Sequence, residues 1–156
     1  MQIRRAIPED YENLLPLFEE VDAFHRDHQP LLFKEPDGPA RDRAYYQSVL
    51  ESEGYYLLVG ELDESLVGLV VVIVKDAPDI PILVPRRYAV IDNLVVRADM
   101  HRSGFGEQLM EAAYDLAREA GATNVELNVF AFNQGAKRFY EHLGYETVTY
   151  KMSKRL

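Results

Sequence analysis

The sequence predicts an α/β (α+β) fold, in which one mixed sheet carries helices on its faces. Three observations predict it. The segments 54–62, 65–74 and 87–96 are rich in β-branched and aromatic residues and have the length of strands. Apolar residues recur at helical spacing over 8–24 and again over 104–120. Strands alternate with helices in the second half of the chain, an order typical of a sheet covered by helices.

The length and composition predict one globular domain over residues 1–156. A chain of this size buries roughly 70% of its unfolded surface. The hydrophobic fraction of 47% excludes a disordered chain. The longest apolar run, at 66–74, is much shorter than the about 18 residues of a membrane helix, so it indicates a buried strand. The N-terminus lacks the apolar core of a signal peptide, and we expect no membrane association.

The charge and the absence of cysteine exclude several functions. The net charge is −9 and no large cluster of Lys and Arg occurs, which argues against a nucleic-acid partner. A negative surface attracts cations and favours a positively charged amine as substrate, although it also serves solubility alone. Without cysteine there is no disulfide, no thiolate zinc site and no cysteine nucleophile. This favours a cytoplasmic location.

The elements of the first half follow from periodicity and from turn residues. Proline and glycine interrupt every period in the loop at 29–38. The tight polar turn at Asp63 and Glu64 joins two strands into a hairpin. In chain order we expect a strand at 2–6, a helix opened by Pro8–Asp10, a second helix from Pro39 through Ser52, and the hairpin strands 54–62 and 65–74.

The second half alternates between strands and helices. Gly121 and Gly144 each follow a helical pattern, where glycine provides a left-handed cap. After a loop at 76–85 we expect a strand at 87–96, a helix at 104–120, a strand at 124–130, a helix at 133–142 and a last strand at 145–152. The predicted order is therefore β-α-α-β-β-β-α-β-α-β.

The stretch "HRSGFGEQLM" at 101–110 places two glycines between a strand and a helix. Free N–H groups at a helix start, together with the helix dipole, can hold an anion, and glycine lets a ligand approach the backbone. A Walker A loop is excluded because Glu107 and Gln108 follow the second glycine. A dinucleotide fingerprint needs a third glycine, which is absent. Spacing alone leaves two alternatives open, phosphate binding and simple helix entry.

Two blocks together resemble the GNAT superfamily of acetyl-CoA-dependent N-acetyltransferases. The first, "VVRADMHRSGFGEQLM", contains the loop His101-Arg102-Ser103-Gly104-Phe105-Gly106, with His101 where the family usually has Gln or Arg. The second, "FNQGAKRFYEHLGYE", carries Asn133, Ala136, Tyr140, Gly144 and Tyr145 at the family's spacing, with Tyr145 in place of phenylalanine. The order of elements matches the family, and the resemblance is strongest over 88–146.

The resemblance implies a mixed, mostly antiparallel sheet with helices on both faces and with strands splayed where the coenzyme binds. The pantetheine arm would pair with the backbone at Leu94–Val96, and the amides of Arg102–Glu107 would hold the pyrophosphate. Acetyl-CoA is the implied cosubstrate, and no metal is implied. The implied coenzyme-binding residues are Leu94, Val95, Val96, His101, Arg102, Ser103, Gly104, Phe105, Gly106, Glu107, Asn128, Asn133, Ala136 and Tyr140.

The implied chemistry is direct attack of a neutral amine on the thioester. A lysine-like amine has a pKa of about 10.4, so a base must take its proton. The backbone N–H of Val96 or a neighbour would stabilise the oxyanion. Tyr140 matches the tyrosine that protonates the leaving thiolate in many members, and a neutral phenol can donate to it. The alternative for Tyr140 is a helix residue packed on the core.

The general base is open. Related alanine acetyltransferases of ribosomal proteins have a glutamate five residues before the helix asparagine, and this position is Asn128 here, which cannot act as a base. By the alternation of the strand expected at 124–130, Asn128 would still point at the cleft. Asp92 is our first candidate, because it interrupts an apolar strand on the Leu94 face and partial burial would raise its pKa. Glu126 is the second candidate. Alternatively, Asp92 caps a bulge or pairs with Arg87.

Partners and alternative functions complete the predictions. His25 and His28 have metal-ligand spacing on a helix but lack a third ligand, so no metal is predicted. The stretch "FHRDHQPLLF" borders the acceptor site if the resemblance holds. The acceptor would be a small-molecule amine, and a homodimer could use 66–74 or the C-terminal strand, as family members tend to do. The alternative function is a sensor or interaction module that binds coenzyme A without turnover.

Overall fold

A five-stranded sheet forms the centre of the molecule. The computed structural model describes residues 1–156. The strands lie in the order β1 to β5, and only the β4–β5 pair is parallel. Their bounds are β1 Gln2–Arg5, β2 Tyr55–Leu62, β3 Ser65–Asp76, β4 Arg87–Val96 and β5 Asn124–Leu127. The predicted class, a mixed and mostly antiparallel sheet with helices on both faces, is confirmed.

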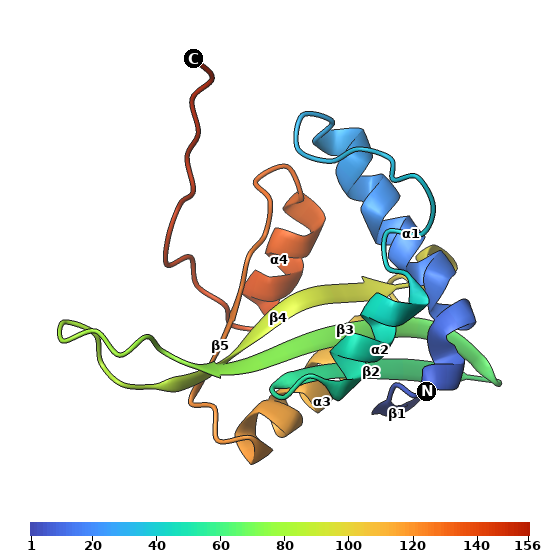
Figure 1. Cartoon of the computed structure of the whole chain (residues 1–156), viewed down its shortest axis with the longest axis horizontal. Coiled ribbons are helices and arrows are strands. Elements are labelled where there is room, and N and C mark those ends of the chain that lie inside the picture. Colours follow the sequence, from blue (N-terminus) through green and yellow to red (C-terminus); the bar gives the residue numbers. More distant parts are fainter.

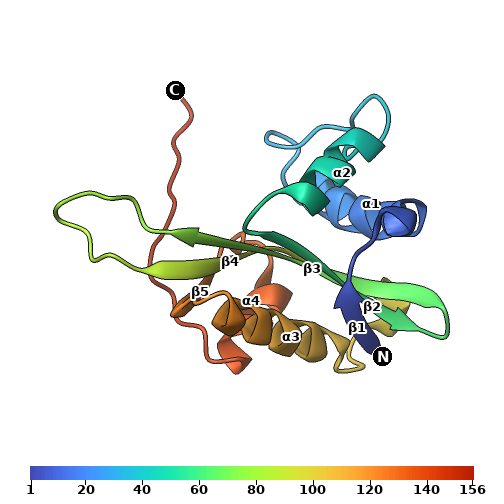
Figure 2. The same cartoon turned by 60° about the horizontal axis from the view of Figure 1, so that its bottom comes forward.

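Four α-helices cover the two faces of this sheet. They are α1 Tyr11–His28, α2 Arg43–Glu51, α3 Phe105–Glu119 and α4 Gln134–His142, with short 3-10 turns η1 Pro8–Asp10 and η2 Ala98–Met100. Figure 2 shows α1 and α2 on one face, and α3 and α4 on the other. None of the helices combines the length and the apolarity that crossing a bilayer would require.

The sheet separates two apolar clusters, and β3 contributes to both. Val70 and Val72 pack with Leu109 and Met110 of α3, while Leu69 and Val71 pack with residues of α1 and α2. Because side chains alternate across a strand, an inner strand with two covered faces is apolar throughout, which explains the run at 66–74. Since β3 is also paired on both edges, it offers no edge to a homodimer, and that part of the prediction is wrong.

Turn and cap residues set the boundaries of several elements. Asp63 and Glu64 both have positive φ, 49° and 62°, as a two-residue type I′ hairpin requires. The second helix was expected from Pro39 but begins at Arg43, because the Asp42 side chain accepts a hydrogen bond from the Tyr45 N–H at 2.8 Å. Asp42 is therefore the N-cap, and Pro39 belongs to the preceding loop.

The two parallel strands, β4 and the edge strand β5, separate at the end of β5. The last β4–β5 pair is Ile91 with Leu127, yet β4 continues to Val96. The strand expected at 124–130 thus ends at Leu127, because residues 128–130 diverge from β4 and lose their hydrogen-bonding partner. The splayed arrangement expected from the resemblance is present.

The strand expected at 145–152 is absent. Residues 145–156 have no regular secondary structure, and Figure 1 shows this segment running away from the body of the molecule. The alternating sequence has a strand pattern, but a strand forms only where a neighbouring strand satisfies its backbone groups. No such neighbour lies along this segment.

Candidate functional site

The unpaired edge of β4 provides free backbone groups at the opening of the sheet. The Arg97 N–H donates to the Val67 carbonyl of β3 at 2.9 Å, so the peptide groups of Arg97 point toward β3. Successive residues of a strand direct their N–H and C=O groups to opposite sides. The groups of Leu94 and Val96 therefore point away from β3, into the gap left by β5. These are two of the positions expected to pair with pantetheine.

The loop at 101–106 joins this edge to the start of α3. Gly104 is the N-cap of α3 and supplies no side chain to the first N–H groups of the helix. The His101 Nε2 lies 2.7 Å from the Val96 carbonyl oxygen, and the Ser103 hydroxyl donates to the Met100 carbonyl at 2.5 Å. These contacts hold the loop against the end of β4. An uncapped helix N-terminus, here beside an open strand edge, is suited to an anion.

The two glycines of the loop serve different purposes. Gly104 has φ of +80°, a left-handed conformation that side chains disfavour, and nothing lies within 4 Å of a Cβ added there. A Cβ at Gly106 would come within 3.3 Å of Cζ of Phe139 in α4. Gly104 therefore makes the turn, whereas Gly106 lets the first turn of α3 approach α4. Arg102, with φ of 64°, adds a second left-handed residue.

Asn133 caps the helix that carries the second motif. Its Oδ1 accepts a hydrogen bond from the Ala136 N–H at 3.0 Å, at the start of α4. The Nδ2 group makes no hydrogen bond within the protein and stays available to a ligand. This capping role explains an asparagine at position 133 without any coenzyme. The contact between Asn133 and the coenzyme therefore stays a prediction.

Tyr140 lies in α4 and packs against the cluster under α3, as Leu94, Val96 and Leu127 also do. Its ring meets the ring of Tyr145 edge-on, with centroids 5.6 Å apart. Burial, and secondarily the nearby Tyr114, raises the pKa of Tyr140 to about 12. The phenol therefore stays protonated at neutral pH, the state that a proton donor needs.

Asp92 occupies a β-bulge, which changes its expected orientation. Val71 pairs with Asn93 and Val72 with Ile91, so Asp92 is the extra residue on β4. Ile91 and Leu94 pack on the same cluster, which an unbroken strand would not allow. The prediction that the Asp92 side chain lies on the same face of the strand as Leu94 is therefore wrong. Asp92 is also exposed rather than partly buried, and it accepts a hydrogen bond from the Asn93 Nδ2 at 2.7 Å.

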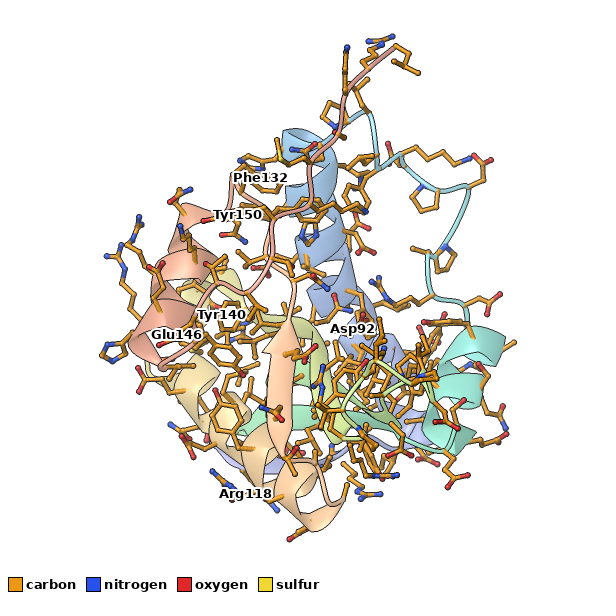
Figure 3. All side chains as sticks on the ribbon, turned by 90° about the vertical axis from the view of Figure 1, so that its left-hand side faces the viewer. Asp92, Arg118, Phe132, Tyr140, Glu146 and Tyr150 are labelled. Atoms are coloured by element: carbon orange, nitrogen blue, oxygen red, sulfur yellow. The ribbon has the colours of Figure 1, made fainter.

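The other carboxylate and amide of this region are exposed. Glu126 is exposed and forms an ion pair with Arg86 at 2.6 Å. Asn128 is exposed and follows the last residue of β5, so strand parity no longer directs its side chain. Arg87 pairs with Asp76 at 3.1 Å and not with Asp92. In Figure 3, Tyr140 lies with α4 and Asp92 lies across β5 from it.

An aromatic cluster joins the end of α1 to the segment after β5. His25 lies 5.4 Å from the rings of both Phe33 and Phe130, and His28 stacks on Phe132 at 4.7 Å and 4°. The stretch 24–33 thus contacts the segment that follows β5. Phe130 and Phe132 were not predicted as site residues from the sequence. The feature that could have indicated them is a pair of aromatic residues at the end of the predicted strand. The histidine rings pack on aromatic rings, and no group of three metal-ligating side chains forms.

Known proteins share both the sequence and the architecture of this chain. Residues 18–145 match the acetyltransferase (GNAT) family. The chain is 27% identical to the uncharacterized N-acetyltransferase YhfO of Bacillus subtilis, over 96% of this chain and 92% of that protein. The solved structure of a tetramutant of the BH1408 protein from Bacillus halodurans has a TM-score of 0.94 at 26% identity, with both chains fully covered.

A more distant structure shares the fold. The aminoglycoside acetyltransferase meta-AAC0020 from an uncultured soil metagenomic sample, solved in complex with sisomicin, has a TM-score of 0.74 at 22% identity. The match covers 99% of this chain and 95% of that protein. The family match and the splayed β4–β5 pair confirm the resemblance seen in the sequence. The chain belongs to the acetyltransferase (GNAT) family, whose cosubstrate is acetyl-CoA, and is an N-acetyltransferase.

Proposed function

We propose that this enzyme transfers the acetyl group of acetyl-CoA to the primary amine of a small, positively charged molecule, by direct attack. The observation that carries the proposal is the open edge of β4, with the uncapped start of α3 at one end and Tyr140 beside it. This combination offers backbone groups for an amide-containing arm, an anion site and a proton donor in one region.

The coenzyme would lie along this edge. Pantetheine amides pair with the free groups of Leu94 and with the N–H of Val96, whose carbonyl already contacts His101, and Val95 lies between them. The amides of Arg102–Glu107 receive the pyrophosphate, aided by the α3 dipole and by Arg102, which has no ion-pair partner within the protein. Asn133 donates its free Nδ2, and the small side chain of Ala136 leaves room beside it. His101 acts indirectly, through its contact with the Val96 carbonyl.

The reaction then needs three groups around the thioester. The amine nitrogen attacks the carbonyl carbon, and the new oxyanion is stabilised by a β4 N–H, that of Val96 or its neighbour. Collapse of the tetrahedral intermediate breaks the C–S bond, and the thiolate takes the phenolic proton of Tyr140. Asp92 accepts the proton that the amine loses, directly or through water. Because Glu126 is already paired with Arg86, Asp92 remains the better candidate.

The acceptor would bind between the aromatic cluster and the β4 bulge. Aromatic faces attract cations, so Phe130 and its neighbours can contact a protonated amine before it reaches the base. The net charge of −9 favours approach of the same molecules. The aminoglycoside acetyltransferase meta-AAC0020 shares this fold and was solved in complex with sisomicin, which supports a small-molecule acceptor. A cytoplasmic location agrees with the absence of cysteine and remains a prediction.

Calorimetric titration of the purified protein with acetyl-CoA tests the proposal, with 3′-dephospho-coenzyme A as a comparison ligand. We expect micromolar binding of acetyl-CoA. A thiol-release screen of amines then follows, and since the chain has no cysteine, the protein adds no background. Binding without turnover across a broad amine panel would instead indicate a coenzyme sensor, and no binding at millimolar ligand would overturn the coenzyme site.

A further inference from the structure

The bulge in β4 places two neighbouring polar side chains on one face of the sheet. In a regular strand, adjacent residues point to opposite faces, so their side chains lie apart. The Asn93 Nδ2 nevertheless donates to the Asp92 Oδ2 at 2.7 Å. Asn93 pairs with Val71, which packs on the cluster beneath α1, so both side chains face the side of the sheet that α1 covers. Figure 3 likewise shows Asp92 on the α1 side of β5.

The Asp92–Asn93 pair lies where the sheet opens. Ile91 is the last β4 residue that pairs with β5, so Asp92 and Asn93 are the first residues along the unpaired part of β4. Leu94 and Val96, proposed above to pair with pantetheine, come next, and the loop proposed for the pyrophosphate follows. The thioester is at the end of pantetheine opposite to the phosphates. In the proposed binding mode it is therefore next to the Asp92–Asn93 pair.

The hydrogen bond also determines which atoms of the pair remain free. An ionised carboxylate has no proton to donate, so the Asn93 amide must turn its N–H group toward Asp92. The Asn93 Oδ1 accepts no hydrogen bond within the protein, and neither does the Asp92 Oδ1. Asp92 is exposed and Asn93 is half-buried, so a ligand in the opening can reach both. Two neighbouring acceptors match the two N–H groups of a neutral primary amine.

We infer that Asn93 orients the acceptor amine, and that the Asp92–Asn93 pair selects primary amines. The Asn93 Nδ2 holds Asp92 in place, and the Asn93 Oδ1 accepts one N–H of the attacking amine. Asp92 takes the proton that the ammonium loses and still accepts the second N–H, because a protonated carboxyl keeps acceptor capacity. With both N–H groups held on the α1 side, the nitrogen lone pair points into the gap, toward the thioester. Tyr140 lies on the other side, with α4, where the thiolate leaves.

The preference for primary amines tests this inference, which rests on the proposed function. The probes are benzylamine and its secondary counterpart N-methylbenzylamine, or the fastest primary amine of the thiol-release screen with its N-methyl derivative. A neutral secondary amine has one N–H and cannot use both acceptors. In wild type we expect kcat/KM to favour the primary amine by about tenfold or more, the effect of one lost hydrogen bond. In Asn93→Ala this preference should shrink by about fivefold or more, while the acetyl-CoA dissociation constant changes by less than about twofold.

A second substitution, Asn93→Asp, separates the two functions of the amide. The new carboxylate still accepts an N–H from the amine and attracts the ammonium, so the KM for the primary amine should stay the same or fall. The kcat should fall about tenfold, because Asp92 loses the donor that holds it in place. Asn93→Ala should instead raise the KM. A merely structural role of Asn93 would change the KM in the same direction in both variants.

Asn124→Ala is the matched control, since it removes an exposed amide at the far end of the β4–β5 pairing. It should leave the kcat, the KM and the preference for primary amines unchanged. An active Asn93→Ala enzyme with the wild-type preference would overturn the inference and leave the proposed function standing. A wild-type chain that binds no acetyl-CoA or acetylates no amine would overturn the proposed function, and the inference with it.

Discussion

At the scale of single residues, Tyr140 has the clearest role to test. We expect Tyr140→Phe to lower kcat roughly 100-fold or more, because the phenolic proton is lost while the ring packing is kept. The acetyl-CoA dissociation constant should change little. Steady-state kinetics and calorimetry measure both. Tyr145→Phe is the matched control, since it removes a buried phenolic hydroxyl from the ring that packs against Tyr140 and should leave kcat nearly unchanged. Equal kcat in wild type and Tyr140→Phe would remove Tyr140 from the chemistry.

Asp92 is tested by the pH dependence of the rate. If it accepts the amine proton, Asp92→Asn should lower kcat and abolish the acidic limb of the pH–rate profile. The matched change Glu126→Gln should keep that limb in place. Because burial raises the pKa of Tyr140 to about 12, neither protein should show a falling limb due to this phenol below about pH 11. An acidic limb that persists in Asp92→Asn would assign the base to Glu126 or to a chain of water molecules.

At the scale of elements, substitutions in the turn into α3 allow the effect of backbone strain to be measured separately from the effect on ligand binding. Gly104 and Gly144 have φ of 80° and 87°, and a Cβ at either position would meet nothing within 4 Å. Alanine at each should therefore destabilise the fold by a similar amount, about 1 kcal/mol. Only Gly104→Ala should also weaken acetyl-CoA binding, by about tenfold, because it alone lies in the loop. Chemical denaturation measures the free energy of unfolding, and calorimetry measures the affinity for acetyl-CoA. Equal acetyl-CoA affinities of wild type and Gly104→Ala would indicate that the loop only starts the helix and does not bind the coenzyme.

The start of α1 depends on an ion pair with a defined pH response. Asp10 is buried, accepts hydrogen bonds from Arg4 at 2.7 and 2.9 Å, and accepts one from the Ile7 N–H at 2.9 Å. The hydrogen bonds from Arg4, more than the opposing effect of burial, hold the pKa of Asp10 below its ordinary value. A lowered pKa in the folded state contributes stability that is present above the unfolded pKa of about 4 and is lost as the pH falls through the lower pKa of the folded state.

Asp10→Asn should therefore lower the free energy of unfolding by about 1–2 kcal/mol at pH 7. The difference from wild type should shrink as the pH falls below about 4, and it should vanish below the lowered pKa of folded Asp10, where the side chain is neutral in both the folded and the unfolded state. Urea denaturation at several pH values measures this. The control is Asp99→Asn, which removes an exposed ion pair with Arg97 and should have no measurable effect. A difference that stays constant with pH would show that the ionised form of Asp10 is not what stabilises the turn.

At the scale of the whole molecule, the net charge of −9 should influence how the acceptor arrives. Raising the ionic strength from about 0.02 to about 0.5 M screens charges beyond a few ångströms. For a cationic acceptor we expect KM to rise severalfold while kcat changes little, because binding depends on the field and the chemical step does not. A neutral amine acceptor should show no such rise. Equal salt dependence for both would assign the negative charge to solubility alone.

Much of this molecule could be predicted because its cause is local in the chain. Alternation identified β2, β3 and β4, the helical period identified α1 and α3, and the motif residues placed the loop at 101–106 between a strand and a helix. Asn133 was predicted at the start of α4, and its capping bond shows why that residue type suits the position. Each of these features depends on neighbours a few residues away, so the sequence alone contains their physical reason.

Other features were decided only by tertiary contacts. The bulge at Asp92 reverses the face on which that side chain lies. The bulge arises in the pairing of two strands, where β4 has one residue more than β3 between the neighbouring pairs. β5 ends at Leu127 although the alternation continues, since the strands diverge there. Residues 145–152 have the alternation of a strand and form none, because alternation specifies which side chains share a face, whereas a strand exists only where a second strand accepts its hydrogen bonds.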